Sequence, residues 1–204
     1  MRTYHFILLV GFIFYSCSKA KDNANGPGKD GFHPADYYLI ATQKNAPVAQ
    51  LYSVSTFGTN GKATIYRVDG FSDCDFHYQD GHLKMIDQQS KTEFADFTIA
   101  NNQIVDAVVD GFLTLASFSL QKIPETDAFS NKVFSGNIFD KANKLTDANV
   151  SYRFNGRTVN GVIVYELKNN AFAYAAPAKS LFVIANGKML FGKSDGSHGE
   201  FAPK

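Results

Sequence analysis

The alternation of hydrophobic and polar positions along the chain is typical of β structure. Short stretches rich in Val, Ile, Thr, Tyr and Phe recur about every ten residues from residue 37 onward, separated by Asn and Gly. We find no window of a dozen residues with a convincing helical period. The sequence therefore predicts an all-β fold of antiparallel hairpins, with strands over residues 37–42, 48–56, 62–68, 74–79, 82–87, 93–99, 103–109, 112–119, 132–139, 147–154, 158–167, 171–176, 180–185 and 188–193.

Five residue pairs have the chemistry of tight hairpin turns. Asp80-Gly81, Asn155-Gly156 and Asn186-Gly187 suit type I′ turns, which need positive φ at both central positions. Asn101-Asn102 and Asn169-Asn170 are weaker versions, because Asn tolerates that conformation less well than Gly. We expect a hairpin at each pair.

Side chains paired across these turns indicate which faces are buried. Around Asn155-Gly156 the apolar face holds Val150, Tyr152, Phe154 and Val159, and the opposite face is polar. Around Asn186-Gly187 both faces are apolar: Phe182, Ile184, Met189 and Phe191 on one, and Leu181, Val183, Ala185 and Leu190 on the other. A strand pair that is apolar on both sides must be covered on both sides. We expect this hairpin to lie deep in the fold; the alternative is an apolar patch exposed for a partner or a lipid.

Residues 120–131 interrupt the rhythm of the strands and contain Pro124. We interpret them as a crossover. The predicted architecture is one all-β domain over residues 33–204, a meander closed as a barrel or folded as a two-sheet sandwich. Alternatively, the domain consists of two packed halves, residues 33–120 and 132–204, and the crossover connects them.

The N-terminal segment predicts export. Residues 6–15 are apolar and follow a single charge, Arg2. A run of this length suits the core of a signal peptide, whereas a membrane-spanning helix needs roughly 20 apolar residues.

The end of the apolar run resembles the lipobox of bacterial lipoproteins, because Cys17 follows it directly and is preceded by the small residue Ser16. The resemblance implies a signal peptide over residues 1–16, a lipid on Cys17 that holds the protein in the cell envelope, and, from Ser18, sorting to the outer membrane. Residues 17–32 would then be the lipidated Cys and a flexible tether. The partner that this implies is the membrane, reached through the N-terminal lipid.

Charge argues against nucleic acid as a partner. Once Arg2 has left with the leader, 19 basic residues balance 19 acidic ones, whereas binding to phosphates relies on an excess of Lys and Arg. With Cys17 acylated, Cys74 is the remaining thiol, and we interpret it as a small buried residue.

Two segments match the residue patterns of known functional motifs but not the secondary structure that these motifs require. Residues 187–194 match the phosphate-binding P-loop, and residues 192–196 match the nucleophile elbow around Ser194. Both motifs require a helix after the turn, and the residues here predict a strand and a polar tail. We reject both.

Two weaker candidate sites remain. His77 and His82 are diagonal neighbours on the polar face of one predicted hairpin, with Asp75 nearby, so they could share a metal; the alternative is a solvated polar face. Phe182, Met189 and Phe191 would line a ligand cavity if the C-terminal hairpin encloses one.

The sequence favours a non-enzymatic binding or structural module of the envelope, because we identify no catalytic residues and no cofactor motif. One alternative is a β-barrel that binds a small apolar ligand. Another is a hydrolase, which would need carboxylates that meet in one cleft.

Overall fold

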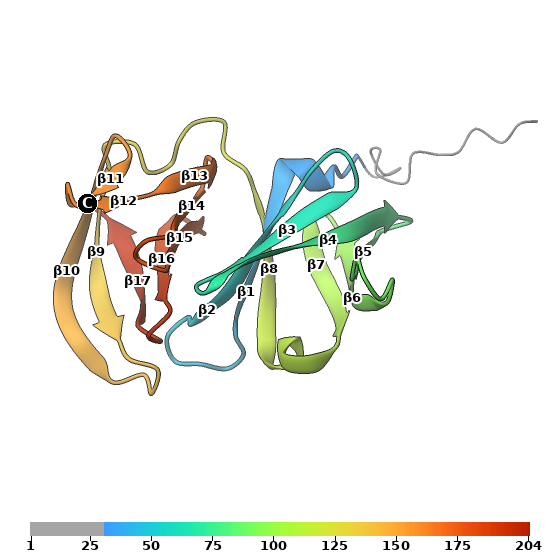
Figure 1. Cartoon of the computed structure of the whole chain (residues 1–204), viewed down its shortest axis with the longest axis horizontal. Coiled ribbons are helices and arrows are strands. Elements are labelled where there is room, and N and C mark those ends of the chain that lie inside the picture. The colour runs from blue at the N-terminus through green and yellow to red at the C-terminus, as the bar shows by residue number, and fades with distance from the viewer. Residues whose placement is uncertain (1–30) are drawn as a thin grey trace, which may run out of the picture.

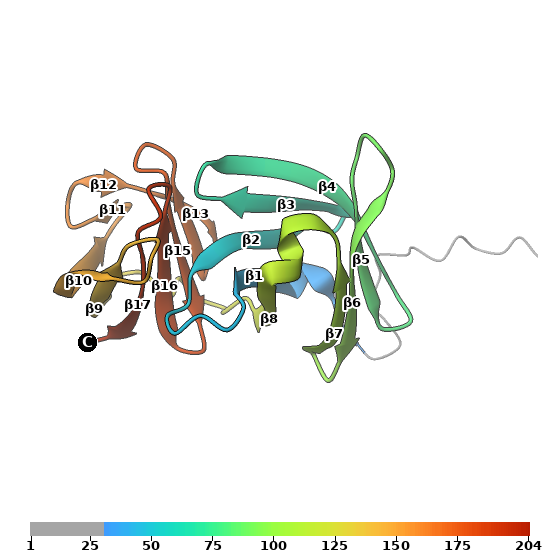
Figure 2. The ribbon, with the colours of Figure 1, turned by 90° about the horizontal axis from the view of Figure 1, so that it is seen from below.

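The computed structural model describes residues 31–204, apart from the side chain of Phe112. Two antiparallel sheets, each nearly closed as a barrel, lie side by side (Figures 1 and 2), so the predicted all-β class is confirmed. The predicted signal peptide, Cys17 and nearly all of the predicted tether lie outside the described residues.

The first sheet has eight strands in the order β7-β6-β5-β4-β3-β2-β1-β8. Its outer strands β7 and β8 lie close together but are not hydrogen-bonded neighbours, which leaves a seam in the barrel. The strands and the two short 3₁₀ helices are η1 (Pro34–Asp36), β1 (Tyr37–Gln43), β2 (Leu51–Phe57), β3 (Lys62–Arg67), β4 (Gly70–Gln79), β5 (His82–Ile86), β6 (Glu93–Ala100), β7 (Gln103–Val109), η2 (Gly111–Leu115) and β8 (Ala116–Lys122).

The second sheet has nine strands in the order β12-β11-β10-β9-β17-β16-β15-β14-β13. The crossover over residues 123–132 connects it to the first sheet, as seen at the top of Figure 1. Its strands are β9 (Val133–Phe139), β10 (Leu145–Asn155), β11 (Thr158–Val159), β12 (Ile163–Val164), β13 (Glu166–Asn169), β14 (Phe172–Ala175), β15 (Ser180–Ala185), β16 (Lys188–Lys193) and β17 (His198–Pro203).

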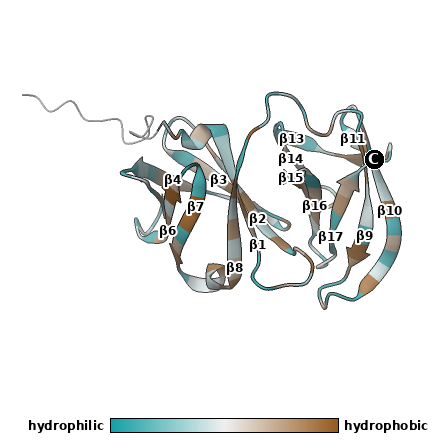
Figure 3. Cartoon of the chain, turned by 180° about the vertical axis from the view of Figure 1, so that it is seen from behind, coloured by the Kyte–Doolittle hydropathy of each residue, from teal (hydrophilic) through white to brown (hydrophobic). Residues whose placement is uncertain are grey.

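Hydrophobic and polar residues alternate along many strands, as the hydropathy colours of Figure 3 show. The buried hydrophobic side chains form three cores. One core fills the first barrel and includes Phe76, Leu83 and Phe97. A second fills the other barrel, where Phe129 of the crossover packs against Phe154. The third core lies between the barrels, so burial joins the two into one molecule.

The core between the barrels explains why some strands are apolar on both faces. On β1, Leu39 belongs to the core of the first barrel, whereas Tyr38 and Ile40 belong to the core between the barrels. On β15, Phe182 belongs to the core of the second barrel and Leu181 to the core between the barrels. The predicted burial of the C-terminal hairpin on both sides is confirmed.

One strand was not predicted. Residues 194–204 read as a polar tail, but β17 pairs with β16 on one side and with β9 on the other. The strand has only one large apolar residue, Phe201, which is fully buried. Two glycines allow the backbones to approach closely: a Cβ on Gly136 would lie 2.3 Å from the Glu200 carbonyl oxygen, and one on Gly199 would lie 2.3 Å from that of Asn137.

Two predicted strands are wrong in their extent. The strand predicted over 112–119 begins as η2, because Gly111, at φ +63°, turns the chain before β8 starts at Ala116. The strand predicted over 158–167 is divided into β11, β12 and β13, because Asn160 and Gly161 both adopt positive φ and form another turn.

The turn predicted at Asn155-Gly156 is displaced by one residue. Asn155 pairs with Thr158 and only Gly156 of the predicted pair has positive φ, so the central residues are Gly156 and Arg157. This displacement moves each cross-strand partner by two positions, which preserves the face of every side chain. Tyr152, Phe154 and Val159 are accordingly buried together, as predicted.

Candidate functional site

A cavity of about 310 Å³ lies inside the first barrel. Residues of β1 to β6 and of β8 surround it, and η2 borders its mouth. The volume is at the lower end of the range for small-molecule sites. The cavity is therefore a candidate binding site for a small molecule.

Small side chains on β1 and β2 create this space. Ala41, Ser53 and Ser55 line the cavity, while Val54, between the two serines, faces the second barrel. Strand alternation places both serines on one wall, about 7 Å apart along the strand. Larger side chains at these three positions would fill the barrel, as the aromatic residues do elsewhere in it.

The two serine hydroxyls have unused hydrogen-bonding capacity. Ser53 is 5% exposed and Ser55 is 4% exposed. Neither hydroxyl has a hydrogen-bond partner within residues 31–204, and neither is sealed off from the cavity. Because both hydroxyls face the cavity, a guest there, either water or a ligand, can complete their hydrogen bonds.

The rest of the wall is mainly apolar and partly aromatic. Met85, Phe97 and Phe118 line the cavity, and the rings of Phe97 and Phe118 meet edge to face at 5.0 Å between centroids. Such surfaces bind the apolar body of a ligand through hydrophobic burial. The site combines an apolar wall with two hydroxyls on β2.

One cation, Arg67, borders the cavity. It is the last residue of β3, on the same inward face as Ala63 and Ile65, and its guanidinium Nη2 donates a hydrogen bond to Ser72 Oγ at 3.2 Å. The side chain is half-buried and forms no ion pair with any residue that the structure describes. Most of its five N–H donors therefore remain available.

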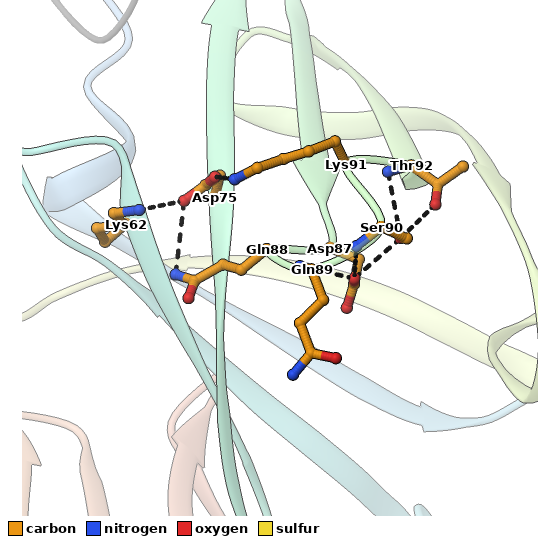
Figure 4. A network of polar contacts seen from close by, with 8 residues as sticks. All are labelled: Lys62, Asp75, Asp87, Gln88, Gln89, Ser90, Lys91 and Thr92. Atoms are coloured by element: carbon orange, nitrogen blue, oxygen red, sulfur yellow. Dashed lines mark hydrogen bonds and ion pairs between the residues drawn. The ribbon is translucent and has the colours of Figure 1, made fainter.

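Three carboxylates also border the cavity, all on exposed residues. Asp73 accepts a hydrogen bond from Thr64 Oγ1 at 2.7 Å on the outer face of the barrel. Asp87 accepts hydrogen bonds from the backbone and hydroxyl of Ser90 (Figure 4), and these bonds lower the pKa of its carboxyl group. Asp110 precedes η2 and makes no side-chain capping bond. A general acid needs a raised pKa, so Asp87 is unsuited to that role.

Cys74 lines the cavity as a buried thiol. Burial, with a smaller contribution from the charges of Asp75 and Asp73, raises the pKa of the thiol to about 12. The thiolate is the reactive form, so Cys74 is not a nucleophile at neutral pH. This agrees with its interpretation as a small buried residue.

Two of the three proposed metal-binding residues, Asp75 and His82, are engaged with other partners. Asp75 bonds to Lys62, to Lys91 at 3.1 Å and to Gln88 (Figure 4), and the two lysines lower the pKa of its carboxyl group. His82 Nδ1 lies 3.0 Å from Asp96 Oδ1, and His77 pairs with Lys84 across the hairpin. Residues 31–204 contain no cluster of three or more His, Cys, Asp or Glu side chains that could hold a metal ion.

The proposed ligand residues lie in the second barrel, away from this cavity. Phe182, Met189 and Phe191 are buried in its core, where Phe182 and Phe191 contact the ring of Tyr152. Their side chains pack against other side chains.

The rejected motif around Ser194 has a structural role. Lys188 to Lys193 form β16 and a turn follows, so neither catalytic motif has its helix. The Lys193 ammonium lies 2.6 Å from Asp195 and lowers the pKa of that carboxyl group to about 2. His198 is buried, with its ring nitrogens 3.1 Å from the Gly196 carbonyl oxygen and 3.0 Å from Asn143 Oδ1.

Sequence reasoning missed Ser53, Ser55 and Arg67. The available signal was the alternation Leu51-Tyr-Ser-Val-Ser-Thr-Phe57, in which small polar residues occupy one face of a strand that is apolar at both ends. That pattern indicates polar groups inside a barrel only once the inner face of the strand is known.

None of the helices formed by the described residues has the length and apolar character needed to span a membrane. Comparison with known protein families, with characterised proteins and with solved structures found no match.

Proposed function

We propose that this protein is a non-enzymatic binding module that takes up a small, mostly apolar molecule in the cavity of its first barrel. The observation that carries the proposal is the pair of buried serines, Ser53 and Ser55, whose hydroxyls face the cavity and have no partner among the described residues. A ligand that hydrogen-bonds to them and covers the aromatic wall would complete the interior.

Energetics supports binding over a purely structural role. An unfilled cavity loses the packing contacts that larger side chains would make. Valine or leucine at either serine position would fill part of the space and restore such contacts. Two small polar residues in this wall therefore add little to stability, whereas a polar group in an otherwise apolar cavity is what selective binding requires.

The carboxylates near the mouth give no support for hydrolysis. Catalysis by paired carboxylates requires one with a raised pKa and one that is free to act as a base or nucleophile. Asp73 is hydrogen-bonded on the outer face, and the pKa of Asp87 is lowered rather than raised. Asp73 and Asp87 therefore do not form the carboxylate pair that a hydrolase would use, and we propose binding without catalysis.

Binding of the neutral apolar dye N-phenylnaphthylamine tests the proposal. The protein is produced with Cys17→Ser, so that no lipid is present to take up the dye. We expect saturable fluorescence enhancement, and at least about tenfold weaker binding for Ser55→Leu, which fills the cavity. Ala41→Val is a milder filling variant in case Ser55→Leu fails to fold.

Ser117→Leu is the matched control, because Ser117 is an exposed serine on β8. Circular dichroism would establish that each variant folds. Equal dye binding by the wild type, the control and the folded cavity-filling variants would contradict the proposal, as would no binding at all.

We also propose that Cys17 anchors the protein in the outer membrane of the cell envelope through a lipid. The support is the apolar run that ends at Ser16-Cys17, and several acyl chains would give stable anchoring. Mass spectrometry of the protein extracted from the envelope should find Cys17 as an acylated N-terminus, and Cys17→Ser should release the protein. An unmodified N-terminus would refute lipidation.

A further inference from the structure

We infer that the ligand of the first barrel carries a carboxylate, which binds the Arg67 guanidinium at the mouth of the cavity. This inference rests on the proposed function and specifies the chemical class of the ligand. It depends on where Arg67 lies, on which of its donors are used and on how the neighbouring charges are already engaged.

The backbone directs Arg67 inward. Side chains on a strand alternate between faces, and Ala63 and Ile65, two and four residues earlier on β3, pack against the core of the first barrel. Arg67 follows them on the same face and lines the cavity. Its partner across the hairpin is Gly70, which has no side chain to occupy the space at the mouth.

The guanidinium has hydrogen-bonding capacity left over. Ser72 Oγ takes one bond from Nη2, and no carboxylate within residues 31–204 forms an ion pair with Arg67. By contrast, Lys62, Lys84 and Lys91 are all ion-paired outside the cavity of the same barrel. A planar guanidinium suits two parallel bonds to a carboxylate, and such charge-assisted bonds are strong.

The acidic residues near the mouth do not favour an amine ligand. Asp73 and Asp87 already accept hydrogen bonds from Thr64 and Ser90, so Asp110 is the only one of these three carboxylates with no side-chain partner among the described residues. Asp110 is exposed, whereas Arg67 is half-buried. Water screens an exposed charge more than a half-buried one, so Arg67 dominates recognition.

Together these features describe an amphipathic acid. Its apolar body would lie against Phe97 and Phe118, polar substituents would reach Ser53 and Ser55, and its carboxylate would remain at the mouth beside Arg67 and Ser72.

Displacement of N-phenylnaphthylamine by three compounds with the same ring tests this inference. Naphthaleneacetate, naphthaleneethanol and naphthaleneethylamine differ in bearing a carboxylate, a hydroxyl or an ammonium group. We expect the carboxylate to bind about tenfold more tightly than the alcohol, which is the effect of one charge-assisted hydrogen bond, and the amine to bind most weakly. Added salt should reduce the preference for the carboxylate.

Arg67→Gln should bring the carboxylate and the alcohol to equal affinity, each measured against the dye affinity of the same variant. Arg67→Lys should keep part of the preference, because it retains the charge without the fork of donors. Arg153→Gln, which changes an exposed arginine of the second barrel, is the matched control and should behave as the wild type.

The possible outcomes separate this inference from the proposed function. No dye binding would refute the proposed function itself. With dye binding intact, equal affinities for carboxylate and alcohol, a preference that survives Arg67→Gln, or tightest binding of the amine with loss on Asp110→Asn would each overturn the carboxylate assignment.

Discussion

Two buried side chains hold their protons more tightly in the folded protein than in the unfolded chain. Burial raises the pKa of Cys74 to about 12 in the first barrel, and burial with the charge of Asp147 raises the pKa of Tyr152 to about 12 in the second. In the unfolded chain these groups ionise near their ordinary values, about 8.5 and 10. Their contribution to stability therefore depends on pH.

The sign of the dependence follows from the raised pKa values. The stabilisation is fully present below about pH 8 and is lost as the pH rises toward 12, because the unfolded chain releases its protons first. We expect the midpoint of urea unfolding to fall between pH 8 and pH 11, and to fall less in the double variant Cys74→Ala, Tyr152→Phe. An equal fall in both proteins would contradict this assignment.

Single residues also show where sequence reasoning succeeded. Asp80-Gly81, Asn101-Asn102 and Asn186-Gly187 all adopt positive φ, as their turn chemistry predicted. Asn169 and Asn170 are not among the residues with positive φ, and their hairpin has an irregular register. The preference of a residue pair for a tight turn is local, so the sequence predicts the turn correctly where the register of the flanking strands permits it.

At the scale of elements, β17 holds the second sheet together. It lies between β16 and β9, and Phe201 contacts Tyr152 and Phe191 inside the barrel. The sequence concealed this strand because one phenylalanine among polar residues and glycine gives almost no alternation signal. The close approach at Gly136 and Gly199 depends on a partner far away in sequence, which no local pattern contains.

The contribution of β17 can be measured through Phe201. Phe201→Ala should lower the free energy of unfolding by about 3–5 kcal/mol, because it removes a fully buried ring. Glu200→Ala on the same strand is the control: it breaks only the exposed ion pair with Lys188 and should cost no more than about 1 kcal/mol. Equal costs in chemical denaturation would mean that β17 contributes little to the core.

At the scale of the whole molecule, the two barrels share a core. Tyr38 on β1 contributes its ring to this core, and its hydroxyl donates a 2.5 Å hydrogen bond to the Ile184 carbonyl oxygen on β15. The ring of Tyr66 on β3 packs at a tilt against the rings of Phe172 and Tyr174 of the second barrel. Strands that face a barrel interior on one side and the other barrel on the opposite side carry apolar residues on both faces.

The candidate site was less predictable than the fold. The all-β class followed from a two-residue period, but the cavity depends on which face of β2 turns inward, and this is decided by the second barrel covering Val54. The hairpin of β15 and β16, which the sequence offered as a ligand site, is covered on both sides, and its side chains pack in two cores. Buried aromatic residues and ligand-binding ones have the same composition, so only their packing separates them.

The order of strands in the second sheet has a consequence for biogenesis. β9 pairs with β10, which follows it closely, but its other edge is completed by β17, after all the intervening strands have been made. The first sheet has the same arrangement: β1 pairs with β2, which follows it, but its other edge is completed only by β8, the last strand of that barrel. As the polypeptide emerges, each half therefore keeps an open strand edge until its last strand has been made, and that interval is when a chaperone would have most to protect.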